Sequence, residues 1–357
     1  MELMRTYFMT GFPGFLATKL IEQLARVPDQ IACFHLLHLP PERNAAVKRR
    51  QDLLERTSLR SEQLVLHEGD ITVEQLALSS EARMMLQQDV THIFHLAALY
   101  DLATAYEPAF RINVIGTANV TQFAHTCRTL ERYIYFSTAY VSGLRSGMVL
   151  EDELQASAFK NAYEETKYLA EVRFRKEIGT IPYTIIRPGI VVGHSETGET
   201  PKWDGVYFVL NAMRLLQSFA PLPYPGRANA LVNLVPYDYV IEATAYLSHA
   251  PVGRNKTYHL TDPFPHGARA IFEMLHVAYY GRYPRGIVPF RLVSTALTPA
   301  VAKRLQMQRQ TLDYFIHPVQ YDTTHALRDL RDTGIICPDL AETMPRLVQY
   351  YQTHATH

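Results

Sequence analysis

The sequence predicts an α/β fold with a doubly wound parallel sheet and a smaller, mostly helical lobe. Short runs of β-branched and aromatic residues alternate with longer helical patterns through the first half of the chain, as in successive βαβ units. Several of the short runs are apolar almost throughout, which is typical of strands buried on both faces of a parallel sheet. With 47% apolar residues among 357, the chain can also bury a substantial core.

The expected elements of the sheet follow one another in a regular order. Apolar runs bounded by turn residues predict the strands, and longer amphipathic stretches predict the helices between them. The predicted strands are residues 6–9, 33–39, 64–67, 92–96, 133–137 and 183–187, and the predicted helices are residues 15–26, 45–56, 113–129 and 163–178.

The second half of the chain has a different pattern of residues. Residues 197–205 are polar and contain glycine, and residues 220–225 contain three prolines, so both are expected to be loops. Residues 234–260 again have helix and strand character, and we expect them to return to the sheet.

Composition and charge narrow the classes of partner. The chain has 35 basic and 35 acidic residues, so no net charge favours a nucleic acid, and a small molecule is the expected partner. Its three cysteines are widely spaced and in no metal-ligand pattern, which favours reduced thiols in the cytoplasm and no metal site. No stretch approaches the roughly 20 apolar residues of a transmembrane helix, and no signal peptide is expected. Peripheral membrane contact and the oligomeric state stay open.

A glycine-containing turn joins the first predicted strand to the first predicted helix. Gly11 permits a tight turn, Gly14 lets a pyrophosphate approach the backbone, and Ala17 allows close packing of helix on strand. The N-terminus of the helix points at the same place and favours an anion. The residues expected to bind a dinucleotide cofactor here are Thr10, Gly11, Phe12, Pro13, Gly14, Phe15 and Leu16.

Two further strand ends fit the same cofactor. Asp70 follows the third strand, where its carboxylate could accept hydrogen bonds from an adenine amino group, and Ile71 stands next to it. The small residues Ala97 and Ala98 follow the fourth strand and would let the backbone lie against the cofactor. We therefore expect a dinucleotide-binding domain and a substrate-binding lobe. The domain comprises residues 1–193 and 234–262, and the lobe comprises residues 194–233 and 263–357.

The residues after the second strand indicate which coenzyme is used. An acidic residue at the strand tip binds the ribose hydroxyl of NAD, whereas a basic residue accommodates the 2′-phosphate of NADP. The strand ends in Leu39 and two prolines, followed by Glu42 and Arg43. Without an acid at the tip, NADP(H) is favoured, with Arg43 as the phosphate ligand, while Glu42 leaves NAD(H) as the alternative.

Tyr163 and Lys167 are the candidate catalytic pair. Their four-residue spacing puts both on one face of a helix, and an ammonium beside a phenol lowers the phenol pKa from about 10 towards neutrality. Such a pair can exchange protons with a substrate. Upstream, a buried-looking strand runs into Ser137 and Thr138. Thr138 could hydrogen-bond a substrate oxygen beside Tyr163, because the carboxyl end of that strand faces the cofactor crevice.

Taken together, these motifs resemble the extended short-chain dehydrogenases/reductases, which have a Rossmann fold, over about the first 260 residues. The resemblance implies that Thr138 and Tyr163 bind and protonate the reacting oxygen, and that Lys167 holds the nicotinamide ribose and lowers the tyrosine pKa. It adds Tyr163, Pro188 and Ile190 to the cofactor contacts. The matching motifs are Gly11/Gly14/Ala17, Gly69-Asp70, residues 95–98, residues 113–117, Ser137-Thr138, Tyr163/Lys167 and Arg187-Pro188-Gly189.

A finer resemblance is to the male-sterility, fatty acyl-CoA reductase and thioester-reductase branch of this superfamily. It rests on residues 95–102, 197–205 and 336–338. It implies reduction of an acyl thioester, carried by coenzyme A or a carrier protein, to an aldehyde, and on to an alcohol if a second hydride follows. Since 357 residues leave no room for adenylation and carrier domains, the acyl thioester is expected to come from outside the chain.

Two other functions stay open. The same set of Thr, Tyr and Lys is implied for extended-family dehydrogenases, reductases and epimerases that act on a sterol, a secondary alcohol or a nucleotide sugar. A non-catalytic NADP-binding regulator is the further alternative, because a fold does not fix a function.

Overall fold

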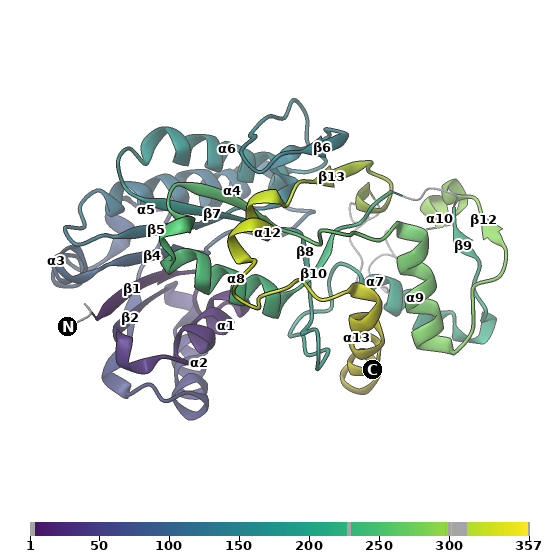
Figure 1. Ribbon diagram of the computed structural model, residues 1–357, viewed down its shortest axis with the longest axis horizontal. Helices are drawn as coiled ribbons and strands as arrows, with labels where there is room; N and C mark the ends of the chain where they lie inside the picture. The colour runs from purple at the N-terminus through teal and green to yellow at the C-terminus, as the bar shows by residue number, and fades with distance from the viewer. Residues whose placement is uncertain (1–3, 227–229, 297, 299–300, 302–312, 356–357) are drawn as a thin grey trace.

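The computed structural model describes residues 4–226, 230–296, 298, 301 and 313–355. Its centre is a seven-stranded parallel sheet with the order β11-β7-β5-β4-β1-β2-β3 (Figure 1). The chain builds outwards from β1 in one direction and then returns to add strands on the other side, which is the doubly wound arrangement that the sequence predicts. The strands are β1 (Arg5–Thr10), β2 (Ile31–His38), β3 (Leu64–Glu68), β4 (His92–His95), β5 (Arg132–Phe136), β6 (Gly147–Val149), β7 (Tyr183–Pro188), β8 (Ile190–Val192), β9 (Tyr224–Pro225), β10 (Leu234–Pro236), β11 (Lys256–Leu260), β12 (Ile287–Val288) and β13 (Val319–Tyr321).

The six strands predicted in the first half are confirmed, with ends that differ by at most two residues. The return of residues 234–260 to the sheet is confirmed as well, because β11 pairs with β7 at one edge. The helices that the structure describes are α1 (Phe15–Leu24), α2 (Arg43–Arg56), α3 (Ser80–Asp89), α4 (Tyr106–Phe110), α5 (Gly116–Ala124), α6 (Ala162–Glu177), α7 (Tyr207–Leu215), α8 (Tyr237–His249), α9 (Ala268–Tyr280), α10 (Phe290–Ala296), α12 (Thr324–Leu330) and α13 (Leu340–His354).

One predicted helix, residues 113–129, differs from the structure. It begins as a π-helical turn, Arg111–Ile115, continues as α5 and ends at Ala124. Asn113 in this turn accepts a hydrogen bond from the Leu99 amide at 2.8 Å and donates one to the Thr166 hydroxyl at 3.0 Å. These two bonds hold the loop after β4 against helix α6, and π-helical turns often occur where a functional site needs such an irregularity.

Helices cover both faces of the sheet because its strands are apolar on both sides. In β1, Tyr7 and Met9 belong to the core under α1, α2 and α8, whereas Phe8 belongs to the core under α3, α5 and α6. Successive side chains of a strand point to opposite faces, so one apolar run serves both cores. The sheet is therefore a rigid base whose carboxyl ends remain available for ligands.

A second lobe lies at the other end of the molecule (Figure 1). A third core joins α7, α9 and α13 around the paired strands β8 and β10. The segment that carries β13 and α12 runs back over the sheet domain, where β13 pairs with β6 and α12 packs against β11. Throughout the part of the chain that the structure describes, no helix combines the length and apolar character needed to cross a membrane.

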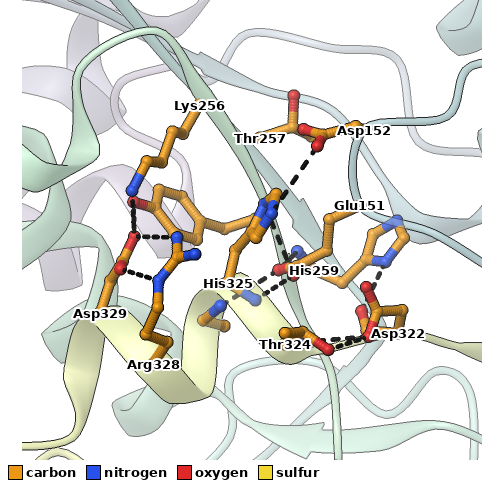
Figure 2. A network of polar contacts seen from close by, with 12 residues as sticks. Glu151, Asp152, Lys256, Thr257, His259, Asp322, Thr324, His325, Arg328 and Asp329 are labelled. Carbon is orange, nitrogen blue, oxygen red and sulfur yellow. Dashed lines mark hydrogen bonds and ion pairs between the residues drawn. The ribbon is translucent and has the colours of Figure 1, made fainter.

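A buried carboxyl group ties this returning segment to the sheet (Figure 2). The side chain of Glu151 has no exposed surface and accepts a hydrogen bond from the His259 amide of β11 at 3.0 Å. It also accepts bonds from the His325 and Ala326 amides at the start of α12, at 2.5 and 3.3 Å. Burial raises the pKa of Glu151 to about 8, although these amides oppose the shift.

We expect this carboxyl to make stability depend on pH. The folded protein keeps the Glu151 proton up to pH about 8, whereas the unfolded chain loses it near 4.5, so the wild type loses stability as pH rises between these values. Glu151→Gln removes this dependence of stability on pH. Thermal unfolding measured from pH 5 to 9 should therefore show the stability of the variant rising relative to that of the wild type as pH increases. Asp152→Asn, at an exposed neighbour, is the control. A difference between Glu151→Gln and wild type that does not change with pH would contradict the assignment.

Candidate functional site

A cavity of about 1200 Å³ lies along the carboxyl ends of the strands, which is where open α/β sheets bind ligands. Residues that follow β1, β2, β3, β4, β5 and β7 line one side. Trp203, Asp204 and Phe208 of the second lobe line the other. Most residues predicted for the site meet here. They are Gly11, Phe12, Gly14, Phe15, Leu16, Asp70, Ile71, Ala97, Ala98, Thr138, Tyr163, Lys167, Pro188 and Ile190.

The glycine turn is shaped to admit a phosphate group. Gly11 has a φ of +86°, and a Cβ there would lie 2.8 Å from the amide nitrogen of Ala97. A Cβ on Gly14 would lie 2.5 Å from the Gly11 carbonyl oxygen. Helix α1 begins directly afterwards with no side-chain cap and no acidic residue in its first turn. Its first backbone amides are therefore available to an anion, and these residues fit a dinucleotide diphosphate.

Thr10, Pro13 and Arg43 are the predicted residues that do not line the cavity. Thr10 is buried behind the turn, where its hydroxyl contacts His95 Nδ1 at 2.7 Å and accepts a bond from the Ala97 amide at 3.2 Å. Arg43 is exposed at the start of α2. The cavity is instead lined here by His38 and Glu42. The order of the residues alone does not show which of these side chains points into the cavity.

Tyr163 stands near the start of α6, opposite Thr138 at the end of β5. The Tyr100 ring packs edge-on against Tyr163, with 5.0 Å between ring centroids. Burial raises the pKa of Tyr163, and a hydrogen bond with the Thr138 hydroxyl lowers it by a smaller amount. The direction predicted from the sequence, a phenol pKa lowered by the neighbouring ammonium, is therefore wrong for this structure, because the loss of solvation outweighs the favourable contact.

Lys167 is buried one turn further along the same helix. Its Nζ donates a hydrogen bond to the Phe136 carbonyl at 2.6 Å and lies 4.7 Å from the centre of the Tyr135 ring. Burial lowers the pKa of Lys167 to about 7, while the negative charge of Glu171 raises it. The ammonium is thus held against the end of β5, beside the strand residues that line the cavity.

Glu171 is itself part of a buried ion pair behind the site. Arg187, which has no exposed surface, donates to both carboxylate oxygens of Glu171, at 2.6 and 3.0 Å. Ser137, which lines the cavity, donates to Glu171 at 2.6 Å, and Arg175 donates at 3.0 Å. Burial would raise the pKa of Glu171, but these partners hold it at about 2. A fixed negative charge therefore lies one helical turn from Lys167.

Three cavity residues that the sequence did not suggest as site residues are Tyr100, Arg111 and Tyr314. Tyr314 is buried, packs edge-on against Tyr140 at 4.8 Å and accepts a hydrogen bond from Asn161 at 3.0 Å. It comes from the segment that returns over the sheet domain, about 150 residues after Tyr163 in the sequence. No local motif signals such a residue.

Comparisons with known proteins agree with this geometry. A family model of NAD-binding proteins described as male sterility protein matches residues 9–244. The nonribosomal peptide synthetase cpsA of Aspergillus campestris is 26% identical and matches 94% of this chain, which spans only 34% of that relative. An alcohol-forming fatty acyl-CoA reductase of Simmondsia chinensis is 26% identical over 78% of this chain and 71% of its own length.

A solved structure shares the architecture of this chain. The terminal R domain from the myxalamid PKS-NRPS biosynthetic pathway is 28% identical, with a TM-score of 0.81 over 99% of this chain and 92% of that one. The family match covers the glycine turn, the ends of β3, β4 and β5, and the Tyr163/Lys167 helix. The chain belongs to the male sterility protein family, within the extended short-chain dehydrogenases/reductases.

Proposed function

We propose that this protein reduces an acyl thioester, bound to coenzyme A or to a carrier protein, to an aldehyde with NADPH. The observation that carries the proposal is the meeting of Thr138, Tyr163 and Lys167 in one cavity with the glycine turn. The relatives named as peptide synthetases and fatty acyl-CoA reductase support a thioester as the substrate.

In the proposed mechanism, the bound cofactor supplies the hydride that is added to the thioester carbonyl carbon. The hydroxyls of Thr138 and Tyr163 donate hydrogen bonds to the carbonyl oxygen and stabilise the negative charge that develops there. Lys167 would hold the ribose of the bound cofactor beside these hydroxyls. Loss of the thiolate then leaves the aldehyde, without a covalent bond to the protein. A second reduction of the aldehyde would give an alcohol.

We also propose that residues 1–193 and 234–262 bind the dinucleotide, and that residues 194–233 and 263–357 bind the substrate. The second lobe supplies Trp203, Asp204 and Phe208 to the cavity wall opposite the strand ends. Phe208 comes from an apolar stretch whose other members, such as Leu210 and Met213, are core residues. An acyl chain in this cavity would have Phe208 and Tyr163 among the residues that surround it.

For the coenzyme, we propose NADP(H), with NAD(H) as the alternative. His38 stands at the tip of β2 where NAD-binding proteins carry an acid, and Arg43 follows nearby. Arg43→Ala should weaken NADPH binding about tenfold and leave NADH binding within about twofold, because only NADPH carries the 2′-phosphate. Fluorescence titration of both coenzymes measures this, with Arg49→Ala in the same helix as the control. Equal weakening for both coenzymes, or for neither, would remove Arg43 from the phosphate site.

Product analysis tests the proposed reaction. The purified protein is incubated with NADPH and a panel of acyl-CoA, acyl-pantetheine and acyl carrier protein thioesters, and the aldehyde and alcohol are quantified. Hydroxysteroids, secondary alcohols and nucleotide sugars are tested in parallel. Turnover confined to these other substrates would reject thioester reduction. If the protein bound NADPH but turned over none of the substrates, it would be a non-catalytic binder.

A further inference from the structure

The chain has no net charge, but its acidic residues are unevenly distributed along the sequence. There is no acidic residue between Asp204 and Asp238, and none between Glu273 and Asp313. With 35 basic and 35 acidic residues in the whole chain, the rest of the molecule has a matching excess of acidic residues. The two stretches contain eight basic residues: Arg214, Arg227, Arg282, Arg285, Arg291, Lys303, Arg304 and Arg309.

The fold brings these two stretches together at the outer end of the second lobe, where β9, β12 and α10 lie (Figure 1). Strand β9 pairs with β12. The Arg285 amide donates to the Leu222 carbonyl at 3.2 Å, and the Leu222 amide donates to His276 Nε2 at 3.0 Å. Arg227 and the last three basic residues lie outside the described residues, so the surface is defined here without them.

The surface at this end combines exposed arginines with exposed apolar side chains. We call it the distal face and define it by Leu216, Phe219, Arg282, Tyr283, Arg285 and Leu292, all of which are exposed. Phe219, Tyr283 and Leu292 expose 74%, 65% and 59% of their surface, so each side chain is accessible to a partner.

The nearest acidic residue in the sequence, Glu273, contacts Tyr224 and is not one of the residues that define this face. Its carboxylate accepts a hydrogen bond from the Tyr224 hydroxyl at 2.6 Å, and the Arg269 guanidinium lies 4.2 Å from the centre of the same ring. Glu273 is thus committed to an internal contact. Among the residues that define the distal face, Arg282 and Arg285 carry positive charge, four are apolar or aromatic, and none is acidic.

We propose that the distal face is the docking surface for an acidic carrier protein that delivers the acyl thioester to the cavity. This inference rests on the proposed function. Its basic residues, among those described, are all arginines rather than lysines, and its apolar residues include Phe and Tyr. Arginine and aromatic residues are enriched at protein interfaces, where lysine is depleted, so a protein fits this face better than a lipid surface does. Its charge is complementary to an acidic partner.

Charge reversal on the distal face tests the proposal. The double variant Arg282→Glu/Arg285→Glu is compared with wild type on octanoyl carrier protein and on octanoyl-pantetheine, which carries the same acyl group without a protein. We expect KM for the carrier-bound substrate to rise about tenfold or more at low salt, with kcat and the KM for octanoyl-pantetheine within about twofold. In the wild type, added KCl should raise KM for the carrier-bound substrate alone.

The matched control reverses two exposed arginines elsewhere, Arg128→Glu/Arg331→Glu. This variant should behave as wild type on both substrates. An unchanged KM for the carrier-bound substrate in Arg282→Glu/Arg285→Glu would overturn the docking proposal, and so would an equal rise for octanoyl-pantetheine. Far-ultraviolet circular dichroism and NADPH titration verify that both variants are folded.

A direct binding measurement separates this inference from the proposed reaction. If the wild type reduces no thioester, the proposed function fails, but anisotropy of a labelled octanoyl carrier protein still reports docking and its loss in the variant. Vesicles of phosphatidylcholine with 30% phosphatidylglycerol test the other kind of partner. Vesicle binding that is lost in Arg282→Glu/Arg285→Glu, together with unchanged carrier binding, would assign the face to a membrane and overturn the proposal.

Discussion

Tyr163→Phe is expected to lower kcat for thioester reduction by roughly 100- to 10,000-fold. The substitution removes the hydroxyl that lies with Thr138 at the cavity wall and keeps the ring that packs against Tyr100. Since the phenol acts on the developing negative charge, the loss should fall on kcat rather than on KM. Steady-state oxidation of NADPH, with the product quantified, measures the effect.

The same variant should bind NADPH with an affinity within about threefold of wild type, because the glycine turn and the strand ends are unchanged. Tyr168→Phe, one position beyond Lys167 on the same helix, is the matched control, since Tyr168 does not line the cavity. Full activity of Tyr163→Phe would exclude the phenol as a group that stabilises the developing negative charge. Loss of activity and NADPH binding together would point to a damaged site rather than to missing chemistry.

We expect Arg187→Met to lower the free energy of unfolding by about 3–5 kcal/mol at pH 7, more than any other variant named here. Arg187 is fully buried and makes two bonds to Glu171, so its removal leaves a buried carboxylate with only Arg175 and Ser137 as partners. Guanidinium denaturation followed by fluorescence measures the free energy of unfolding. Arg173→Met on α6, the helix that carries Glu171, is the control, because its pair with Glu177 is partly exposed and should contribute about 0.5 kcal/mol or less.

The effect of Arg187→Met should also depend on pH. In the wild type the pKa of Glu171 is about 2 in the folded state, below its ordinary 4.5. This pair therefore contributes stability above pH 4.5, and the contribution is lost as pH falls towards 2. Without Arg187 the folded pKa rises, so the difference between variant and wild type should shrink between pH 5 and pH 3. A deficit of constant size over this range would show that the arginine acts by filling space.

Most of the fold could be predicted from the sequence because its signals are local. A strand buried on both faces must be apolar throughout, and a helix that covers it must repeat its apolar residues every three or four positions. The alternation of such segments up to β7 therefore predicts a parallel sheet with helical crossovers. The glycine turn was visible for the same reason, since a tight approach of backbone to phosphate requires residues without side chains at fixed spacing.

The site was only partly visible from the sequence. Its motifs lie at the carboxyl ends of the strands. Those ends come together because parallel strands place their carboxyl ends at one edge of the sheet. The direction of a side chain near a strand end does not follow from the sequence, so the sequence does not show that Glu42 rather than Arg43 lines the cavity. The pKa of Tyr163 was misjudged because spacing shows the neighbouring Lys167 but not how deeply the phenol is buried.

By itself, the sequence determined the doubly wound sheet, the glycine turn and the Tyr163/Lys167 helix, because each depends on residues close together in the chain. Only the tertiary structure decided that Tyr314 lines the cavity, that Arg187 fixes the charge beside Lys167, and that two acid-free stretches meet at the distal face. These contacts join residues that are far apart in sequence. Burial and charge at such contacts depend on how separate segments pack, and no local pattern of residues records that packing.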